Sequence, residues 1–526
     1  MGRKEDNIKR ATEVMHQRDR IRNLAIAAHI DHGKTTLSDN LIAGAGMMSE
    51  DLAGKSRVLD FDDQESARGI TINAASASMV HSVNGDDYLI NLIDTPGHVD
   101  FGGDVTRAMR AVDGCIILTC AVEGAMPQTE TVVRQALKEK VRPVLFINKV
   151  DRLINELQVT PEDMMSRFEE QITRVNTLIR QFAPEEHRKD WQVSVQGGTV
   201  AFGSAYHNWG ITLPYMQKSG VNFTQIFEFC HNEQQKELAK KAPVHEVLLD
   251  MAVEELPSPI VAQRYRIPNI WQGDLESETG TAMIECDSKG PLSLMITKIW
   301  MDPHAGEVAV GRIYSGTISH GETVWALGGA KPERVQQVSM MVGGDRIQVP
   351  EVSSGNIVAL TGVRSAAAGV TVTRDEDATP FEAIRHYSEP VVTVAVEPKS
   401  MKDLPKFIDA LRSLAKADAS LQVFTNQETG EALLAGMGEL HLEITVYRLE
   451  EEQNIKVSVS EPIVVYRESI SSDNKGRSFE GKSPNRHNRF YIETEPLPDD
   501  VVNALREGAF GDGTVRNKDA KQVGDQ

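Results

Sequence analysis

Residues 24–35 read Leu-Ala-Ile-Ala-Ala-His-Ile-Asp-His-Gly-Lys-Thr, and the rest of the chain is organised around this stretch. The apolar run at 24–28 predicts a buried strand. It ends in the pattern Ala28-x-x-x-x-Gly33-Lys34-Thr35, and a helical stretch follows at 36–45. This is the pattern of a phosphate-binding loop, with Ala28 where the first glycine usually stands. The backbone N–H groups of such a loop and the positive end of the following helix bind phosphate groups.

Two side chains of this loop have predicted roles. Lys34 can reach the β- and γ-phosphates of a nucleotide, and the Thr35 hydroxyl is placed to bind Mg²⁺. The alternative is a chance loop that contains Gly-Lys-Thr. Three further motifs at suitable spacings make that alternative negligible.

Length and composition indicate a multidomain protein without a membrane span. At 526 residues the chain is too long for one core, and three or four domains are expected. Its apolar content of 40% and charged content of 25% are ordinary for a globular protein. No apolar run approaches the ~20 residues of a membrane span. The charged start at 1–6 lacks the apolar core of a signal peptide, so we expect a cytoplasmic protein.

Cysteine spacing and net charge exclude some other classes. The four cysteines show no C-x-x-C pairing and no metal-ligand spacing, which favours reduced, structural thiols. The formal net charge of −20 argues against binding to nucleic acid through overall charge. A local basic patch could still dock on a ribosome.

A polar, acidic stretch at 46–67 leads into Arg68-Gly-Ile-Thr71. A loop that ends in a threonine is what a nucleotide-sensing switch requires. Thr71 can close on Mg²⁺ and the γ-phosphate and let go after hydrolysis. Taken alone, Thr71 would be an ordinary threonine at a strand edge.

A second buried strand is predicted at 88–94, and it runs into Asp94-Thr-Pro-Gly97-His98. A carboxylate at the carboxyl end of a parallel strand lies beside the phosphate loop, where Asp94 can hold a water of the Mg²⁺ shell. Gly97 allows its N–H to approach the γ-phosphate closely. His98 then lies where an attacking water could be oriented. A lone histidine is usually structural or solvated, but its place directly after Asp-Thr-Pro-Gly favours the functional interpretation.

A third motif predicts the choice of base. Core strands are expected at 115–121 and 143–148, and the second ends in Asn148-Lys-Val-Asp151. The Asp151 carboxylate can accept hydrogen bonds from N1–H and the 2-amino group of guanine. Adenine lacks this pair of donors and would leave the carboxylate unpaired, which is costly. An exposed Asn-Lys turn is the structural alternative.

The other elements predicted in the first domain give less information about function. Pro127 is placed to open a helix at 128–138. Apolar residues at steps of three and four predict an amphipathic helix at 161–182 that packs on the core. A last strand at 198–202 ends in Gly-Ser-Ala, whose backbone could support the guanine from the other side. No pattern assigns a role to the insert at 184–260.

The second half of the chain changes character twice. Alternating strands at 292–301, 307–318, 322–327, 334–341 and 356–361 predict a small β-barrel. The order β-α-β-β-α-β at 390–462 predicts a ferredoxin-like domain. Within it, His441 has no partner ligand at i+3 or i+4 and is expected to be a packing or surface residue rather than a metal ligand. From residue 461 a fourth region begins, whose basic segment 483–489 is either an RNA-facing segment or a solvated turn.

The predicted fold class is therefore multidomain α/β. A GTP-binding domain with a mostly parallel sheet and helices on both faces is expected at 1–264. A β-barrel follows at 265–380, a ferredoxin-like α+β domain at 381–460, and the beginning of a fourth α+β domain at 461–526.

The candidate site residues come from these motifs. The predicted catalytic residue is His98, and the predicted metal ligands are Thr35, Thr71 and Asp94. The predicted nucleotide-binding residues are Ala28, His29, Ile30, Asp31, His32, Gly33, Lys34, Thr35, Asp94, Thr95, Pro96, Gly97, His98, Asn148, Lys149, Val150, Asp151, Ser204 and Ala205.

Together these motifs resemble those of the translational GTPases. The segment 122–130, Val-Glu-Gly-Ala-Met-Pro-Gln-Thr-Glu, is similar to the one that follows the second switch in that family. The segments 436–442, Gly-Met-Gly-Glu-Leu-His-Leu, and 483–489, Ser-Pro-Asn-Arg-His-Asn-Arg, narrow the resemblance to the archaeal and eukaryotic elongation factor 2 family. The absence of a very large insert in the first domain favours the archaeal form.

The resemblance implies a ribosome-dependent GTPase that drives translocation of tRNA and mRNA. It implies GTP or GDP and Mg²⁺ as cofactors, and a monomer whose partners are ribosomal RNA and stalk proteins. In that family the histidine that matches His98 orients the hydrolytic water, and the residues that match Thr71 and Asp94 serve Mg²⁺. The rivals are another translational GTPase, such as a release or initiation factor, and a nucleotide-dependent ribosome-binding module without turnover.

Two departures from the family pattern are visible. Ala67 stands where many members carry glutamate, which should leave the Mg²⁺ chemistry intact. The family continues beyond residue 526 through a fourth and a fifth domain, with a modified histidine, diphthamide, at the tip. We therefore expect a fragment or a truncated product that retains GTP binding.

Overall fold

The strand predicted before the Gly-Lys-Thr sequence is β1 (Ile21–Ala28), and it lies inside the sheet of the first domain. In this computed structural model, β1 pairs in parallel with β3 (Asp86–Asp94) on one side and with β4 (Gly114–Cys120) on the other. The strand order is β2-β3-β1-β4-β5-β6-β7. β2 is antiparallel to β3, and β7 is antiparallel to β6. The parallel strands therefore end at one edge of the sheet, where phosphate-loop proteins bind their ligands.

The structure describes residues 3–47, 63–68, 70–302, 305–342, 345–384, 390–418, 420–425, 432–461, 463–464, 477–483, 487–495 and 501. The chain forms two units, residues 1–463 and 464–526. Four predicted features fall wholly or partly outside the described residues. They are most of the polar stretch 46–67, Gly69 of the switch motif, residues 484–486 of the basic segment, and most of the fourth region at 461–526.

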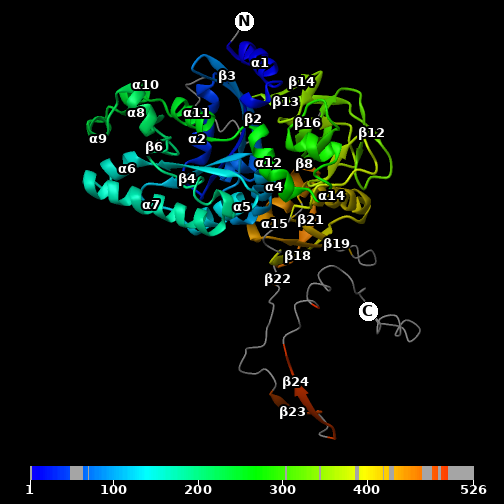
Figure 1. The fold of residues 1–526 in the computed structure, drawn as a ribbon. Coiled ribbons are helices and arrows are strands. Elements are labelled where there is room, and N and C mark those ends of the chain that lie inside the picture. The colour runs from blue at the N-terminus through cyan, green and yellow to red at the C-terminus, as the bar shows by residue number, and fades with distance from the viewer. Residues whose placement is uncertain are drawn as a thin grey trace. The chain divides into compact units, whose positions relative to one another are not determined.

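Helices cover both faces of the first sheet (Figure 1). β1 is buried on both faces, because Leu24 and Ile26 pack in one apolar cluster while Ala25 and Ala27 pack in another. The remaining strands of this sheet are β2 (Ala75–Val83), β5 (Arg142–Asn148), β6 (Val200–Ser204) and β7 (Trp209–Ile211). The helices are α1 (Arg3–Val14), α2 (Lys34–Gly44), α3 (Asp63–Arg68), α4 (Gly102–Ala111), α5 (Pro127–Lys138), α6 (Val150–Asn155) and α7 (Pro161–Phe182).

The predicted insert at 184–260 contains part of the sheet, because β6 and β7 lie within it. Its helix α11 packs on α2 and on β7. The helices of this region and of the connection to the next domain are α8 (Leu213–Ser219), α9 (Phe223–His231), α10 (Gln235–Lys241), α11 (Val244–Glu255), α12 (Pro259–Ile270) and α13 (Glu278–Ile284).

The second domain is built of short antiparallel strands, as predicted. One predicted strand, 307–318, is in fact two strands, because the chain turns at Gly316 with a φ of 77°. The alternating pattern failed to indicate β14, β15 and β17. The strands are β8 (Ser293–Asp302), β9 (Gly306–Ser315), β10 (Thr317–Ser319), β11 (Thr323–Ala326), β12 (Glu333–Arg334), β13 (Gln337–Val342), β14 (Asp345–Val349), β15 (Glu351–Ser353), β16 (Ile357–Thr361) and β17 (Thr371–Thr373).

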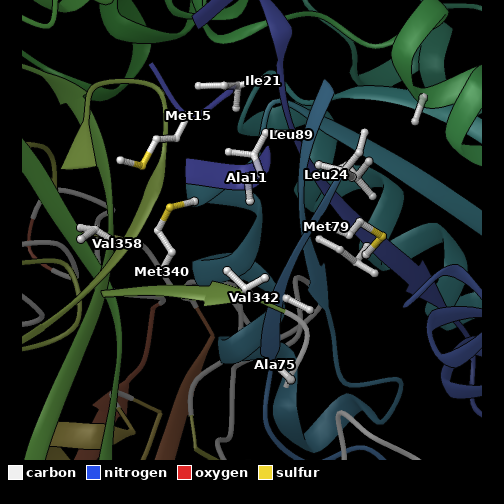
Figure 2. Close-up of a cluster of buried hydrophobic side chains, with 14 of the residues drawn as sticks. Ala11, Met15, Ile21, Leu24, Ala75, Met79, Leu89, Met340, Val342 and Val358 are labelled. Atoms are coloured by element: carbon white, nitrogen blue, oxygen red, sulfur yellow. The ribbon is translucent and has the colours of Figure 1, made fainter. Parts of the chain in front are cut away.

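The barrel and the first domain share an apolar core. Met15 of the N-terminal segment, Leu89 of β3 and Met340 of β13 belong to one buried cluster, which Figure 2 shows. β13 also meets β2 at a single parallel pair, Val342 with Ser78. The two domains are therefore joined by packing as well as by the chain.

The third domain has the predicted order of elements and forms an antiparallel sheet in the order β19-β20-β18-β21. Its second helix, α15 (Glu439–Tyr447), continues into a wider π-type turn at Arg448–Glu452. The elements are β18 (Val392–Pro398), α14 (Leu404–Ala417), β19 (Gln422–Thr425), β20 (Ala432–Gly436), α15 (Glu439–Tyr447), β21 (Val457–Val459) and β22 (Ile463–Val464). The second unit contains a hairpin of β23 (Ser478–Lys482) and β24 (Arg489–Glu493).

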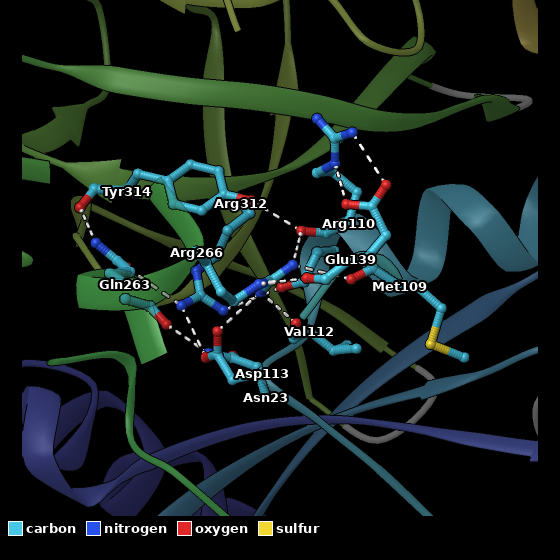
Figure 3. Close-up of polar contacts among 12 residues, drawn as sticks. Asn23, Met109, Arg110, Val112, Asp113, Glu139, Gln263, Arg266, Arg312 and Tyr314 are labelled. Carbon is cyan, nitrogen blue, oxygen red and sulfur yellow. Dashed lines mark hydrogen bonds and ion pairs between the residues drawn. The ribbon is translucent and has the colours of Figure 1, made fainter. Parts of the chain in front are cut away.

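A buried carboxylate, Asp113, joins the first domain to the barrel (Figure 3). Asp113 Oδ1 accepts a hydrogen bond from Arg266 of α12 at 2.9 Å, and Oδ2 accepts one from Arg312 of β9 at 2.9 Å. Asn23 of β1 also donates to Oδ2, at 2.9 Å. All three charged side chains are fully buried. A buried charge is tolerated only when it is paired and hydrogen-bonded. Removing one of these side chains therefore leaves the others buried without their partner.

The substitution Asp113→Asn should be strongly destabilising, because it leaves two buried guanidinium groups without their counter-charge. We expect the free energy of unfolding to fall by about 3–5 kcal/mol in urea titrations at neutral pH. The matched control is Asp409→Asn, which removes the carboxylate of an exposed pair with Arg412, 3.7 Å long. That change should cost about 1 kcal/mol or less. Equal losses in the two variants would contradict this account.

The same carboxylate should make stability depend on pH. Burial disfavours the charged form of Asp113, but Arg312, Arg266 and the hydrogen bonds outweigh it and hold its pKa below the usual value. A lowered folded pKa means that the stabilisation is present above the unfolded pKa of about 3.9 and is lost as the pH falls through the folded value. Asp113→Asn should therefore lose less stability than the unmodified chain below about pH 4.

Candidate functional site

A cavity of about 530 Å³ lies at the carboxyl ends of the parallel strands. The loop after β1 lines its centre, and the ends of β5 and β6 contribute Asn148 and Ala205. Residues 70–71 and 97–98, from the two switch motifs, line it as well. The motifs that are far apart in the sequence therefore meet in one place.

The loop after β1 has the backbone of an anion-binding turn. Asp31 and Gly33 have positive φ angles of 61° and 93°. Helix α2 begins directly afterwards at Lys34, and no side chain of a described residue caps its first turn. The N–H groups of that turn are therefore free to bind an anion, with the helix dipole in support.

Four side chains converge at the start of α2. Lys34 Nζ lies 2.8 Å from Asp94 Oδ2 and donates a hydrogen bond to Thr71 Oγ1 at 3.0 Å. The hydroxyls of Thr35 and Thr71 lie 3.2 Å apart. Asp94 is fully buried, and its Oδ1 has no hydrogen-bond partner among the residues that the structure describes.

This set of atoms fits a hard cation such as Mg²⁺. It offers two hydroxyls and one carboxylate oxygen, and Mg²⁺ prefers oxygen ligands and usually keeps phosphate and water in its shell. Among the described residues, no group of three or more histidine, cysteine, aspartate or glutamate side chains could hold a metal ion on its own. The orphaned Asp94 Oδ1 is the observation that favours an additional partner here.

The segment 94–98 packs tightly on the phosphate loop. Thr95 donates a hydrogen bond to Ile26 O at 2.7 Å. A Cβ atom on Gly97 would lie only 3.3 Å from Ile30 N, so glycine suits this approach. His98 lines the cavity, and its Nδ1 accepts a hydrogen bond from Asp100 N at 3.2 Å. In a neutral ring this bond leaves the proton on Nε2.

Asn148 ties the base end of the cavity together. Its Nδ2 donates to His32 O and its Oδ1 accepts from Ala205 N, both at 2.8 Å. Lys149, with a φ of 62°, donates to Asp31 O at 2.5 Å. The loop after β1, the end of β5 and the end of β6 are therefore held in a single arrangement.

Asp151 presents a carboxylate oxygen at this end of the cavity. Its Oδ1 is buried and has no hydrogen-bond partner in the described part of the chain. Its Oδ2 lies 3.5 Å from His207 Nε2. A buried, unpaired carboxylate oxygen calls for a donor from a ligand.

Most of the predicted site residues line the cavity, and the others lie behind it. Those that line it are His29, Ile30, Asp31, Gly33, Lys34, Thr35, Thr71, Gly97, His98, Asn148, Lys149, Asp151 and Ala205. Those behind it are Ala28, His32, Asp94, Thr95, Pro96, Val150 and Ser204.

His32 illustrates the supporting group. Its side chain is fully buried, and its Nε2 lies 3.2 Å from Glu123 Oε2. Burial, with a contribution from His29, lowers the pKa of His32 although Glu123 opposes this. His32 is therefore a neutral packing residue beneath the loop.

Sequence reasoning missed several lining residues: Thr36, Asp39, Ile70, Arg152, Glu156, Tyr206 and His207. Tyr206 and His207 directly follow the predicted Ser-Ala pair, so their position was a usable signal. Arg152 and Glu156 form an ion pair of 2.9 Å across one helical turn after the Asn-Lys-Val-Asp motif. That spacing alone is common on exposed helices and carries no functional signal.

The fold and the cavity are those of the phosphate-loop nucleotide-binding class. A family model described as the elongation factor Tu GTP binding domain matches residues 19–258. Models described as elongation factor G domain 2 and elongation factor G domain III match residues 291–375 and 387–461.

Whole-chain relatives narrow this class. Elongation factor 2 of Picrophilus torridus is 62% identical over 523 residues, which cover 99% of this chain and 71% of the relative. Elongation factor 2 of Pyrococcus furiosus is 60% identical with the same coverage, and that of Thermoplasma acidophilum is 58% identical. The chain belongs to the elongation factor 2 family. Among the described residues, no helix is long and apolar enough to cross a bilayer.

Gly33 provides a test of how the site is held. A Cβ atom there would lie 2.6 Å from Asn148 Nδ2, whereas at Gly85, whose φ is also near 90°, it would meet nothing within 4 Å. Both Gly→Ala changes incur the backbone cost of a positive φ, but only Gly33→Ala also displaces Asn148. We expect Gly33→Ala to lower the free energy of unfolding by about 1–3 kcal/mol more than Gly85→Ala does.

The background variant Asn148→Ala checks the cause. In that background the additional cost of Gly33→Ala should disappear, because the atom that it meets has been removed. If the two glycine substitutions cost the same in the unmodified chain, the contact with Asn148 has no part in holding the site.

Proposed function

We propose that this chain is a ribosome-dependent GTPase that couples GTP hydrolysis to movement of tRNA and mRNA during elongation. The observation that carries the proposal is that two buried carboxylate oxygens, one behind the cavity and one lining it, have no hydrogen-bond partner among the described residues. Asp94 Oδ1 lies behind the phosphate loop, and Asp151 Oδ1 lies at the opposite, base end. The name elongation factor 2 carried by the relatives supports the ribosome as the partner and the cytoplasm as the location.

Asp151 would select guanine. Its carboxylate accepts hydrogen bonds from N1–H and the 2-amino group, and a base without these donors leaves a buried charge unpaired. Ala205 and Lys149, held by Asn148 and Asp31, would border the base.

The phosphates would bind at the start of α2. Lys34 would turn from Asp94 toward the β- and γ-phosphates, and the N–H groups of the loop would surround them. Thr35, Thr71 and Asp94 would hold Mg²⁺, Asp94 through water. When bound, Mg²⁺ neutralises charge on the β- and γ-phosphate oxygens.

His98 would orient the water that attacks the γ-phosphorus. The new bond joins the water oxygen to phosphorus, the bond to the β-phosphate oxygen breaks, and GDP and phosphate leave. Among the described residues that line the cavity, the one arginine is Arg152, which pairs with Glu156 near the base end. We therefore propose slow intrinsic turnover and activation by the ribosome.

His98→Ala should separate hydrolysis from binding. With homologous ribosomes present, we expect the rate of GTP hydrolysis to fall by about 10²–10⁴-fold, while the Kd for a fluorescent GTP analogue changes little. The control is His320→Ala, an exposed histidine in the barrel. Undiminished hydrolysis by His98→Ala would rule out this role.

The unmodified chain, assayed with and without ribosomes, tests the larger proposal. Strong stimulation supports a ribosome-dependent GTPase. Nucleotide binding without stimulation favours the alternative of a nucleotide-dependent ribosome-binding module.

Asp151→Asn should change the preferred base. An amide can accept from N1–H and donate to the 2-oxo group of xanthine, but it meets the 2-amino group of guanine with a second donor. We expect GTP affinity to fall by about 10²-fold or more and affinity for xanthosine triphosphate to exceed it. Titration calorimetry with both nucleotides measures this, with Asp409→Asn as the control. Unchanged preference for GTP would show that Asp151 does not recognise the base.

A further inference from the structure

One helix of the third domain lies against both switch motifs. Glu443 of α15 pairs with Arg68 at 2.9 Å, and Arg448, just after α15, donates a hydrogen bond to Asn73 at 3.0 Å. Ile444 packs with residues 72 and 101 in a small buried cluster. The helix therefore touches the chain on both sides of Thr71 and just after His98.

Asp100 connects this helix to His98. Its carboxylate Oδ1 lies 3.4 Å from His98 Nδ1. Its Oδ2 accepts a hydrogen bond from the backbone N of His441, in the first turn of α15, at 3.4 Å. Asp100 is buried, and a carboxylate at a helix N-terminus is stabilised by the helix dipole. The Asp100 carboxylate thus contacts the helix, while the backbone N–H of the same residue donates to the imidazole.

Gly438 lets the two domains approach this closely. A Cβ atom there would lie within 2.5 Å of Asp100 Oδ1 and Cγ. The φ of Gly438 is −170°, which is extended backbone that any residue adopts. The requirement for glycine comes from the Asp100 carboxylate in the other domain, and backbone geometry does not impose it.

A second set of charged groups contacts the first turn of the helix. His441 Nε2 lies 2.8 Å from Asp418 Oδ2, and Arg107 of α4 lies 3.9 Å from Asp418 Oδ1 and also pairs with Asp104. Burial opposes the charge of Asp418, but the hydrogen bond from His441 and the charge of Arg107 hold its pKa well below the usual value. The third domain therefore docks on α4 through charges, in a defined register.

We propose that Asp100 is a positioning residue through which docking of helix α15 sets the orientation of the His98 imidazole. The inference rests on the proposed role of His98 in hydrolysis. With α15 docked, the hydrogen bond from His441 N holds the Asp100 carboxylate, and the backbone N–H of Asp100 is thereby fixed against His98 Nδ1. With α15 displaced, Asp100 Oδ2 loses its hydrogen bond from His441 N, and the backbone N–H that holds the His98 imidazole is no longer fixed. The third domain thereby controls turnover without touching the nucleotide.

The kinetic test uses Gly438→Ala, Asp100→Ala and the double variant. We expect each single variant to lower the ribosome-stimulated kcat about 10-fold or more with KM for GTP nearly unchanged, because a misplaced group slows the chemical step. In the Asp100→Ala background Gly438→Ala should add nothing, since the carboxylate that it displaces is gone. The control is Gly102→Ala, where a Cβ atom would come no closer than 4.0 Å to its nearest neighbour.

A second readout does not depend on turnover. In chain labelled with ¹⁵N-histidine, the His98 imidazole signals are identified by their loss in His98→Ala. Gly438→Ala should shift these signals and leave those of His320 unchanged.

The two readouts separate the two proposals. If ribosomes fail to stimulate the unmodified chain, the proposed function fails, and the His98 signals still decide the link to α15. Unmoved His98 signals, or kcat losses that simply multiply in the double variant, would overturn the inference.

Discussion

The structure depends on one buried carboxylate, Asp113, which two arginines from elsewhere in the chain share. Arg266 comes from the helix that leaves the first domain, and Arg312 comes from a strand of the barrel. Because Asp113 directly precedes β4, next to β1, the pairing fixes the barrel relative to the strands that carry the nucleotide site. Burying three charges is costly, and the attraction between them offsets this cost only in one geometry. The same pairing thus fixes the orientation of the barrel, and breaking it is destabilising.

The nucleotide site is held by polar contacts between loops whose sequences are far apart. Asn148 bridges the loop after β1 and the end of β6, and Lys149 adds a bond to the carbonyl of Asp31. Among the residues that the structure describes, these contacts leave two buried carboxylate oxygens without a hydrogen-bond partner, Asp94 Oδ1 and Asp151 Oδ1. The backbone and the Asn148 amide therefore preorganise the site, and the carboxylates of Asp94 and Asp151 can accept hydrogen bonds or coordinate ligands there. Preorganisation of this kind reduces the ordering cost of binding.

Local sequence was sufficient to predict the elements that carry motifs, because a polar residue that follows a buried strand lies at the edge of the sheet. Asp94 and Asn148 lie at strand ends as predicted, and the ferredoxin-like order was correct. The prediction of a single strand at 307–318 was wrong, because the turn at Gly316 does not interrupt the alternation of apolar and polar residues. Contacts between the first and the third domain were not predicted. The need for Gly438 arises from Asp100, more than 300 residues earlier, and no local pattern encodes such a pair.

The docking of the third domain combines a small apolar contact with a larger set of charges. The apolar cluster between the domains contains few buried side chains, Ile72, Phe101 and Ile444. Around it lie Asp100, Arg107, Asp418 and His441, buried or nearly so. Apolar area supplies affinity roughly in proportion to its size, whereas buried charges impose register and contribute little net stability. An interface built in this way is specific and weak. The charged contacts therefore set the register of α15 against the segment that follows His98.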